Sequence, residues 1–215
     1  MKYGKKTAPR SSPAARKLLA KKKDLFARQR PNHYLRAMEL VTLHDKQFKP
    51  YITAETIHAN ISILAEKLSA DVKKSFPLFI VVLNGSFIFA ADLVKLLKFP
   101  CEITFVKLAS YHGTSSTGNV SELIGLTENI EGRTVVVVED IIDTGNTLEK
   151  LHALLKDKNA KEIRTATLLF KPEAYKKNIK VDYVGIPIKN EFVVGYGLDY
   201  NGLGRNLKDI YILNS

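Results

Sequence analysis

The chain has no tryptophan, only one cysteine, and no apolar run of the length that a membrane-spanning helix needs. The single cysteine, Cys101, cannot form a disulfide within the chain or supply the paired thiolates of a zinc site. Basic residues near the N-terminus are not followed by an apolar core, so no signal peptide is predicted. We therefore expect a protein of a reducing compartment, the cytoplasm, that does not contact a membrane.

Acidic residues are almost absent from the first 36 positions. Residues 1–36 contain twelve Lys and Arg but a single acid, Asp24, whereas residues 37–215 contain 21 basic and 21 acidic residues. The formal net charge of +11 therefore belongs to an N-terminal arm. Large apolar residues are also few there, so we expect residues 1–36 to be disordered and residues 37–215 to form the folded domain.

The basic arm allows several interpretations. Clustered Lys and Arg bind nucleic-acid phosphates without sequence preference. A composition rich in Arg, Lys and Ser and poor in acids is also that of an organelle transit peptide. The arm could instead be sequence upstream of a true start at Met38, or a dispensable solvated tail.

Apolar periodicity predicts alternating helices and strands after the arm. Helical spacing begins after Thr53, and two more helices are predicted at residues 87–98 and 147–156. Strands are predicted at residues 78–83, 103–108, 135–140, 163–170, 181–186, 192–196 and 210–213. This order indicates an α/β fold with a parallel sheet flanked by helices, while the short strands near both ends form a small cap over the strand tips.

The most informative segment is residues 135–147, which read Val-Val-Val-Val-Glu-Asp-Ile-Ile-Asp-Thr-Gly-Asn-Thr. We interpret it as a buried strand ending at Glu139 and Asp140, a turn with Asp143, and the start of a helix. Ligands bind at the carboxyl ends of parallel strands. Backbone N–H groups and hydroxyls of such a turn suit a phosphate, whereas the acids suit ribose hydroxyls and Mg²⁺. The segment therefore predicts a site for a phosphorylated sugar and a metal ion.

This segment resembles the phosphoribosyl pyrophosphate (PRPP) signature of the type I phosphoribosyltransferases, and its Glu-Asp-Ile-Ile-Asp-Thr-Gly core is similar to that of the hypoxanthine-guanine branch. The resemblance covers about residues 40–213 and implies Mg²⁺-dependent transfer of 5-phosphoribosyl from PRPP to N9 of hypoxanthine, and of guanine. IMP or GMP and pyrophosphate are the implied products. Asp143 is the implied general base or acid at purine N7, and Glu139 and Asp140 the implied holders of ribose and Mg²⁺. The implied 5′-phosphate loop consists of Thr144, Gly145, Asn146 and Thr147.

Two further segments resemble parts of the same site. Leu83-Asn84-Gly85 is similar to the family's pyrophosphate-binding loop, which implies a cis peptide between Leu83 and Asn84. Some relatives carry Lys or Arg where this chain has Asn84, so we expect contact through the backbone. Ser110 and Tyr111 open the polar segment 110–121 and resemble the pair in the catalytic loop that closes over the site.

The resemblance also implies the residues that bind the base. Lys171 would donate to the purine 6-oxo group, which gains negative charge in the reaction. Phe192 would stack on the base, and Val193 would present backbone groups to its edge. Asp199 would act near a second metal ion and the exocyclic group of guanine, and Arg205 would contact pyrophosphate through its planar fork of donors.

Two alternatives stay open. Some proteins of this fold are regulators that bind nucleic acid and sense PRPP or a nucleotide; the basic arm is consistent with that role, whereas Lys171 and the base-binding segment favour an enzyme. A different base, such as xanthine or uracil, is the other alternative. Lys171, Phe192 and Asp199 favour a 6-oxopurine without ranking hypoxanthine, guanine and xanthine. Relatives are commonly dimers or tetramers, so we expect a homodimer or homotetramer.

Overall fold

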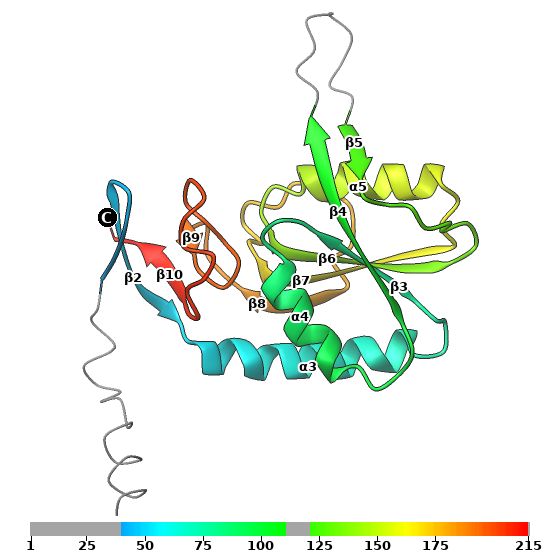
Figure 1. Cartoon of the computed structure of the whole chain (residues 1–215), viewed down its shortest axis with the longest axis horizontal. Coiled ribbons are helices and arrows are strands. Elements are labelled where there is room, and N and C mark those ends of the chain that lie inside the picture. Colours follow the sequence, from blue (N-terminus) through cyan, green and yellow to red (C-terminus); the bar gives the residue numbers. More distant parts are fainter. Residues whose placement is uncertain (1–39, 111–120, 215) are drawn as a thin grey trace, which may run out of the picture. The chain divides into compact units, whose positions relative to one another are not determined.

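The computed structural model describes residues 40–110 and 121–214, and one compact unit begins at Leu40 (Figure 1). Its helices are α3 (Ala54–Val72), α4 (Phe87–Leu96) and α5 (Asn146–Asp157). Its strands are β1 (Val41–Leu43), β2 (Lys46–Ile52), β3 (Leu78–Val82), β4 (Glu102–Ser110), β5 (Ser121–Ile124), β6 (Thr134–Ile142), β7 (Glu162–Phe170), β8 (Tyr183–Pro187), β9 (Val193–Val194) and β10 (Ile210–Leu213). The predicted arm, residues 1–36, lies outside the described residues.

The main sheet has six strands in the order β5-β4-β3-β6-β7-β8. Strands β4, β3, β6, β7 and β8 pair with their neighbours in parallel. Strand β5 pairs with β4 in the antiparallel direction and forms one edge of the sheet. Helices α3 and α4 cover one face, and α5 covers the other (Figure 1). The structure confirms the predicted parallel sheet flanked by helices.

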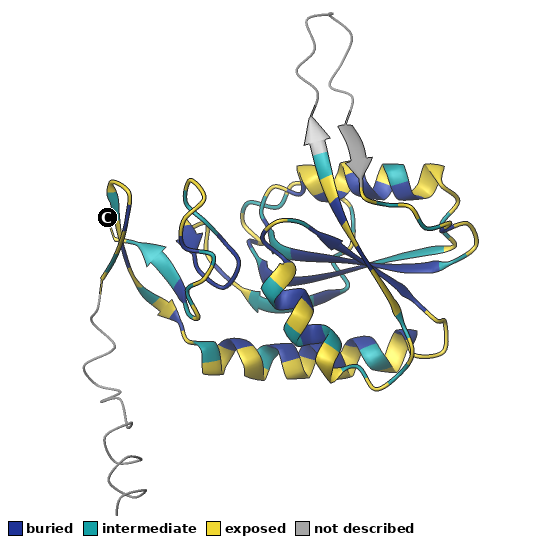
Figure 2. Ribbon diagram, viewed as in Figure 1, coloured by how far each residue is buried: buried dark blue, intermediate teal, exposed yellow. Residues whose placement is uncertain are grey.

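The apolar runs of the central strands are buried because both faces of the sheet are covered. In β3, Phe79 and Val81 pack with α3 and α4, whereas Leu78 and Ile80 pack with α5. Strand β6 alternates in the same way, so neither strand needs a polar face. Figure 2 shows the result, with buried central strands and helices that are buried along one side.

Helix α3 begins where the sequence predicts. The Thr53 hydroxyl accepts a hydrogen bond from the Thr56 backbone N–H at 3.3 Å, and the Asp209 carboxylate accepts one from the Ala54 N–H at 2.7 Å. These bonds satisfy N–H groups that have no partner within the first helical turn. Residues at helical spacing then face the core, namely Ile57, Ile61, Leu64, Ala65, Leu68 and Val72.

A second, four-stranded antiparallel sheet in the order β1-β2-β10-β9 forms the cap, which we call the hood. It joins strands from both ends of the described chain around Leu43, Phe48 and Val194. The cap subdomain is thus confirmed, although the β1–β2 hairpin was not predicted.

Several predicted boundaries were wrong by a few residues, among them the following three. Strand β6 continues to Ile142, beyond Glu139 and Asp140, because its ladder with β7 continues to the pair Ile142 and Phe170. The polar segment predicted at 110–121 is shorter, because Ser110 and Ser121 pair in the β4–β5 ladder. The strand predicted at 192–196 is reduced to β9, because the chain turns at Gly195 with φ +99°.

No helix in the described ranges, 40–110 and 121–214, has the length and apolar character needed to cross a membrane. The cytoplasmic location stays a prediction.

Candidate active site

The predicted site residues gather at the carboxyl ends of three neighbouring parallel strands. Asn84 and Gly85 follow β3, Asp143 follows β6, and Lys171 follows β7. Because β3, β6 and β7 are adjacent and parallel, these turns share one edge of the sheet.

The loop after β3 lies directly against the acidic strand. The peptide between Leu83 and Asn84 is cis, at the position that the resemblance implied. A Cβ atom at Gly85 would stand 1.5 Å from a carboxylate oxygen of Asp140, and one at Gly197 would stand 2.0 Å from the Gly85 carbonyl oxygen. Both glycines are therefore required by close approach, and three segments distant in sequence meet at this point.

Near the end of β6, the Glu139 side chain is buried and the Asp140 side chain is half-buried. Burial raises the pKa of Glu139 well above its ordinary range, and the neighbouring Asp140 charge adds to this rise. Burial also raises the pKa of Asp140, to about 6, although the Ile141 backbone N–H donates to its carboxylate at 2.8 Å and the Arg205 charge acts in the opposite direction. The negative charge here is only partly compensated by the protein, so the pair suits a bound cation or donor hydroxyls.

Asp143 and Lys171 form an ion pair between two adjacent strand ends. The Lys171 ammonium donates to the Asp143 carboxylate at 2.6 Å. Lys171 is 7% exposed, whereas the Asp143 side chain is 44% exposed. The buried lysine is thus fixed at the end of β7 by an acid whose side chain is partly exposed to solvent.

A small pocket of about 100 Å³ lies at the start of α5 and is lined by Glu139 and residues 141–148. Gly145 has φ +85°, and a Cβ atom there would stand 2.5 Å from the Tyr175 ring and 2.8 Å from Lys177 Cγ. The turn also accepts a hydrogen bond at the Thr144 carbonyl from the Lys176 N–H, at 3.3 Å. The start of a helix with free N–H groups suits an anion.

The predicted base-binding segment lies partly in the hood. Phe192 is 46% exposed, and its ring is backed by Phe48 at 6.1 Å and Tyr200 at 5.8 Å between centroids. Val193 is buried in β9. A half-exposed ring with fixed neighbours is suited to stacking on a flat ligand.

Asp199 and Arg205 hold each other in the loop that follows β9. Their side chains form an ion pair at 2.6 Å, and Arg205 also donates to the Gly197 carbonyl at 2.7 Å. The Asp199 carboxylate accepts from the Gly202 N–H at 2.6 Å. Both charges act on Asp140, so this loop is electrostatically part of the site.

Comparison with known proteins supports the resemblance to the phosphoribosyltransferases. The phosphoribosyl transferase domain family matches residues 52–201. A curated hypoxanthine-guanine phosphoribosyltransferase from Streptococcus pyogenes is 47% identical over 151 residues, which are 70% of this chain and 84% of that protein. The chain belongs to the hypoxanthine-guanine phosphoribosyltransferase family. As a member, it is a transferase of purine salvage.

Solved structures of this family agree in fold. A crystal structure of a hypoxanthine-guanine phosphoribosyltransferase from Bacillus anthracis has a TM-score of 0.70 and 36% identity, and the match covers 77% of this chain and 98% of that one. A hypoxanthine phosphoribosyltransferase from Trypanosoma cruzi, solved in a ternary complex with substrates, has a TM-score of 0.71 and 34% identity over 80% and 97% of the two chains.

Mg²⁺, the metal implied for this phosphoribosyltransferase, fits the donors near β6. Residues 40–110 and 121–214 include no cluster of three or more His, Cys, Asp or Glu placed to hold a metal ion. Mg²⁺ is commonly bound by one or two carboxylates together with substrate phosphates and water. Two neighbouring carboxylates whose charge the protein compensates only in part therefore fit an ion that arrives with a diphosphate substrate.

Not every predicted residue of the phosphoribosyltransferase site is placed. Ser110 ends β4, and Tyr111 lies outside the described residues, so the catalytic-loop prediction is not tested. A larger groove of about 650 Å³ between α3 and the end of α4 contains none of the predicted site residues.

Sequence reasoning missed the residues that contact the predicted 5′-phosphate loop and the helix after it. Tyr175 contributes its ring beneath Gly145, and Lys177 pairs with Glu149 of α5 at 2.7 Å. Both partners lie about 30 positions away along the chain, so no local spacing indicates these contacts.

Proposed function

We propose that this chain catalyses Mg²⁺-dependent transfer of the 5-phosphoribosyl group from PRPP to N9 of hypoxanthine, and of guanine, with release of pyrophosphate. The products would be IMP and GMP. The observation that carries the proposal is the Asp143–Lys171 ion pair, which stands at the strand ends beside an anion-sized pocket, the buried Glu139 and the half-buried Asp140.

The phosphorylated sugar would bind along the strand ends. Backbone N–H groups of residues 143–147 and the hydroxyls of Thr144 and Thr147 would hold the 5′-phosphate at the start of α5. Glu139 and Asp140 would hold the ribose hydroxyls and, with Asp199, the Mg²⁺ ions. The metal, when bound, would neutralise charge on the leaving pyrophosphate. Backbone groups of Leu83, Asn84 and Gly85 and the Arg205 guanidinium would bind the pyrophosphate group itself.

The purine would lie between the hood and the Asp143–Lys171 pair. Phe192 would stack on its face, and Val193 would present backbone groups to its edge. Lys171 would donate to the 6-oxo oxygen, where negative charge gathers as the base attacks carbon 1 of the ribose. Asp143 would hold or move the proton at N7. Ser110 and Tyr111 would help to exclude water.

The proposal is tested by initial rates with PRPP and Mg²⁺ and with hypoxanthine, guanine, xanthine, adenine or uracil. We expect nucleotide formation from hypoxanthine and guanine, its loss with EDTA, and its return when Mg²⁺ is restored, because the diphosphate cannot be neutralised without the cation. PRPP binding without turnover of any base would contradict the enzyme. Salt-sensitive nucleic-acid binding that disappears on deletion of residues 1–36 would then support the regulator.

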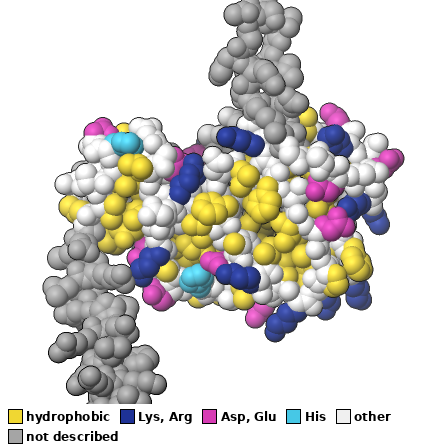
Figure 3. All heavy atoms as spheres, viewed as in Figure 1, with side chains coloured by type: hydrophobic (Ala, Val, Ile, Leu, Met, Phe, Trp, Pro, Cys, Tyr) yellow, Lys and Arg dark blue, Asp and Glu magenta, His cyan; other side chains and the backbone are white. Residues whose placement is uncertain are grey.

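We further propose that the chain forms a homodimer or homotetramer through the uncovered face of β4. Ile103 and Phe105 on this strand are 41% and 49% exposed, and Phe87 and Leu96 of α4 are also exposed. Figure 3 shows hydrophobic side chains gathered on the face that carries α4 and β4. Parallel strands are normally covered on both faces, and a second copy of the chain would supply the missing cover.

This assembly predicts a change of mass on substitution of Phe105. We expect the unaltered protein to have the mass of two or four chains in light scattering, and Phe105→Lys to dissociate toward the monomer because a charge cannot be buried unpaired at an interface. Ile63→Lys, on the exposed side of α3, is the matched control and should leave the mass unchanged. A monomeric unaltered protein would contradict the proposal.

A further inference from the structure

Tyr196 is a buried side chain that the reaction outlined above does not use. It is 3% exposed and stands between two glycines, Gly195 with φ +99° and Gly197 with φ +103°. Tyr196 itself has φ +50°, and its N–H donates to the Leu207 carbonyl at 2.8 Å. This turn carries the phenol out of the hood sheet, and its hydroxyl donates to the Asp92 carboxylate of α4.

Asp92 is fixed by several partners. Lys95, three residues later on α4, donates to it at 2.6 Å, and His58 of α3 lies 3.7 Å away. Although burial opposes ionisation of Asp92, the hydrogen bonds from Lys95 and Tyr196 outweigh it and lower the pKa of this acid. Burial and the Asp92 carboxylate raise the pKa of Tyr196. The bond therefore joins a protonated phenol to an ionised carboxylate, which is a strong type of hydrogen bond.

This bond connects two segments that meet in the site. Helix α4 starts directly after the loop that contains Gly85, and Tyr196 immediately precedes Gly197. Gly197 lies so close to the Gly85 carbonyl that a Cβ atom would stand 2.0 Å from it. The backbone carbonyl of Gly197 also accepts a hydrogen bond from the Arg205 guanidinium. A shift of Tyr196 would therefore displace Gly197, and with it both the contact with the loop at Gly85 and the carbonyl that holds the Arg205 side chain.

We propose that Tyr196 and Asp92 are positioning residues that hold the Gly197–Arg205 segment against the loop after β3 and so preorganise the diphosphate half of the PRPP site. The inference rests on the proposed function. The base half has its own supports, because Phe192 is backed by Phe48 and Lys171 is held by Asp143. Loss of the bond should therefore weaken diphosphate binding and spare the base.

The test is Tyr196→Phe, which removes one hydroxyl, together with Asp92→Asn, which keeps the shape of the acceptor. We expect each variant to raise the KM for PRPP, and the KM for pyrophosphate in the reverse reaction, by about tenfold, which corresponds to ~1.4 kcal/mol. The KM for hypoxanthine should stay unchanged within error. The double variant should be no worse than Tyr196→Phe alone, because Asp92→Asn removes the charge of the acceptor and so weakens the same bond that Tyr196→Phe removes.

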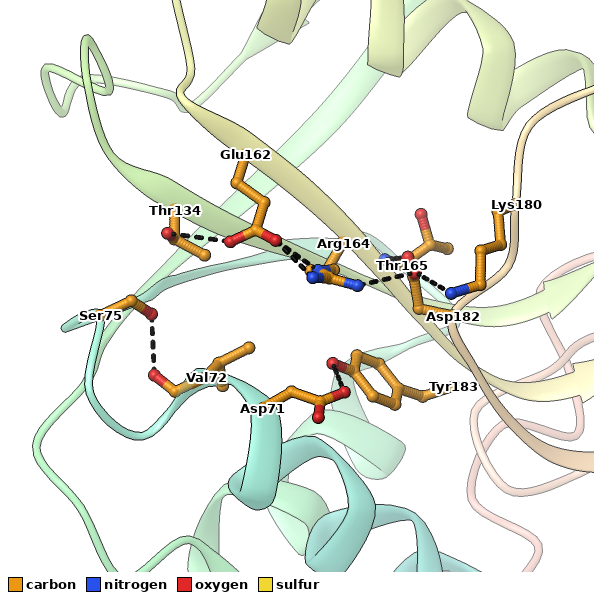
Figure 4. Close-up of polar contacts among 10 residues, drawn as sticks. All are labelled: Asp71, Val72, Ser75, Thr134, Glu162, Arg164, Thr165, Lys180, Asp182 and Tyr183. Atoms are coloured by element: carbon orange, nitrogen blue, oxygen red, sulfur yellow. Dashed lines mark hydrogen bonds and ion pairs between the residues drawn. The ribbon is translucent and has the colours of Figure 1, made fainter.

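Tyr183→Phe is the matched control. Tyr183 is also buried, and its hydroxyl donates to the Asp71 carboxylate at 2.8 Å (Figure 4). This bond joins the first residue of β8 to the last turn of α3, away from the carboxyl ends of the strands where the candidate site lies. We expect Tyr183→Phe to lower the melting temperature about as much as Tyr196→Phe but to leave the KM for PRPP unchanged.

The outcomes separate this inference from the proposed function. An unaltered protein with no turnover in the same assay would overturn the function. Normal turnover with an unchanged KM for PRPP in both Tyr196→Phe and Asp92→Asn would overturn only the positioning role. An equal rise in Tyr183→Phe would also overturn it, because the effect would then follow from general loss of stability.

Discussion

Replacement of Asp143 by Asn is expected to lower kcat for nucleotide formation by about 100-fold to 10,000-fold, which is the usual contribution of a positioned acid or base. Asn has the same shape but cannot take up a proton from the base at neutral pH. The KM for PRPP should change little, because the proposed phosphate loop would bind its ligand mainly through backbone groups. Steady-state rates over a range of PRPP and hypoxanthine concentrations measure both quantities.

Glu149→Gln is the matched control for this variant. Glu149 also pairs with a lysine beside the phosphate loop, Lys177 at 2.7 Å, so its neutralisation removes a comparable ion pair without touching the base site. We expect near-normal kcat from this control. Equal losses of kcat and of PRPP affinity in Asp143→Asn would count against proton transfer and indicate that the Lys171 pair mainly shapes the site.

The second large effect is expected for Gly85→Ala. The new Cβ atom would stand 1.5 Å from a carboxylate oxygen of Asp140, so either the loop or the acid has to move. A displacement of about 1 Å at a reacting site can cost ~100-fold in rate, and we expect at least that loss in kcat/KM for PRPP. The KM for hypoxanthine and the circular dichroism spectrum should change far less.

Gly132→Ala provides a control for loss of a glycine. A Cβ atom at Gly132 meets nothing within 4 Å, although φ there is +70°, so its cost is backbone strain alone. We expect a lower melting temperature with normal kinetics. Full activity of Gly85→Ala would show that Asp140 has room to retreat, and that its contact with the loop is not needed for PRPP binding.

The sequence alone predicted the central part of the fold. The apolar runs of β3 and β6 are buried on both faces, so their burial depends little on which element covers them. Helix α3 was predictable because Thr53 and the helical spacing after it are local signals. By contrast, the β1–β2 hairpin was missed, since β1 has three residues and becomes a strand only through pairing with β2.

The candidate site divides in the same way. Residues 135–147 indicated a phosphorylated sugar and a metal ion, because acids, glycine and hydroxyls stand together in one short segment. The end of β6 was wrong, since the length of a strand depends on its neighbour, and β7 continues to pair as far as Ile142. The residue that makes glycine necessary at position 85 was equally hidden, because the Asp140 side chain that excludes a Cβ there is distant in sequence.

The sequence by itself therefore determined the type of chemistry, which is carried by short runs whose members are close before folding. The tertiary structure alone decided how these runs meet: Lys171 against Asp143, Gly85 against Asp140, and Tyr196 against Asp92. The two members of each pair lie between 28 and 104 positions apart in the sequence. Only the packing of strands and helices brings such partners into contact.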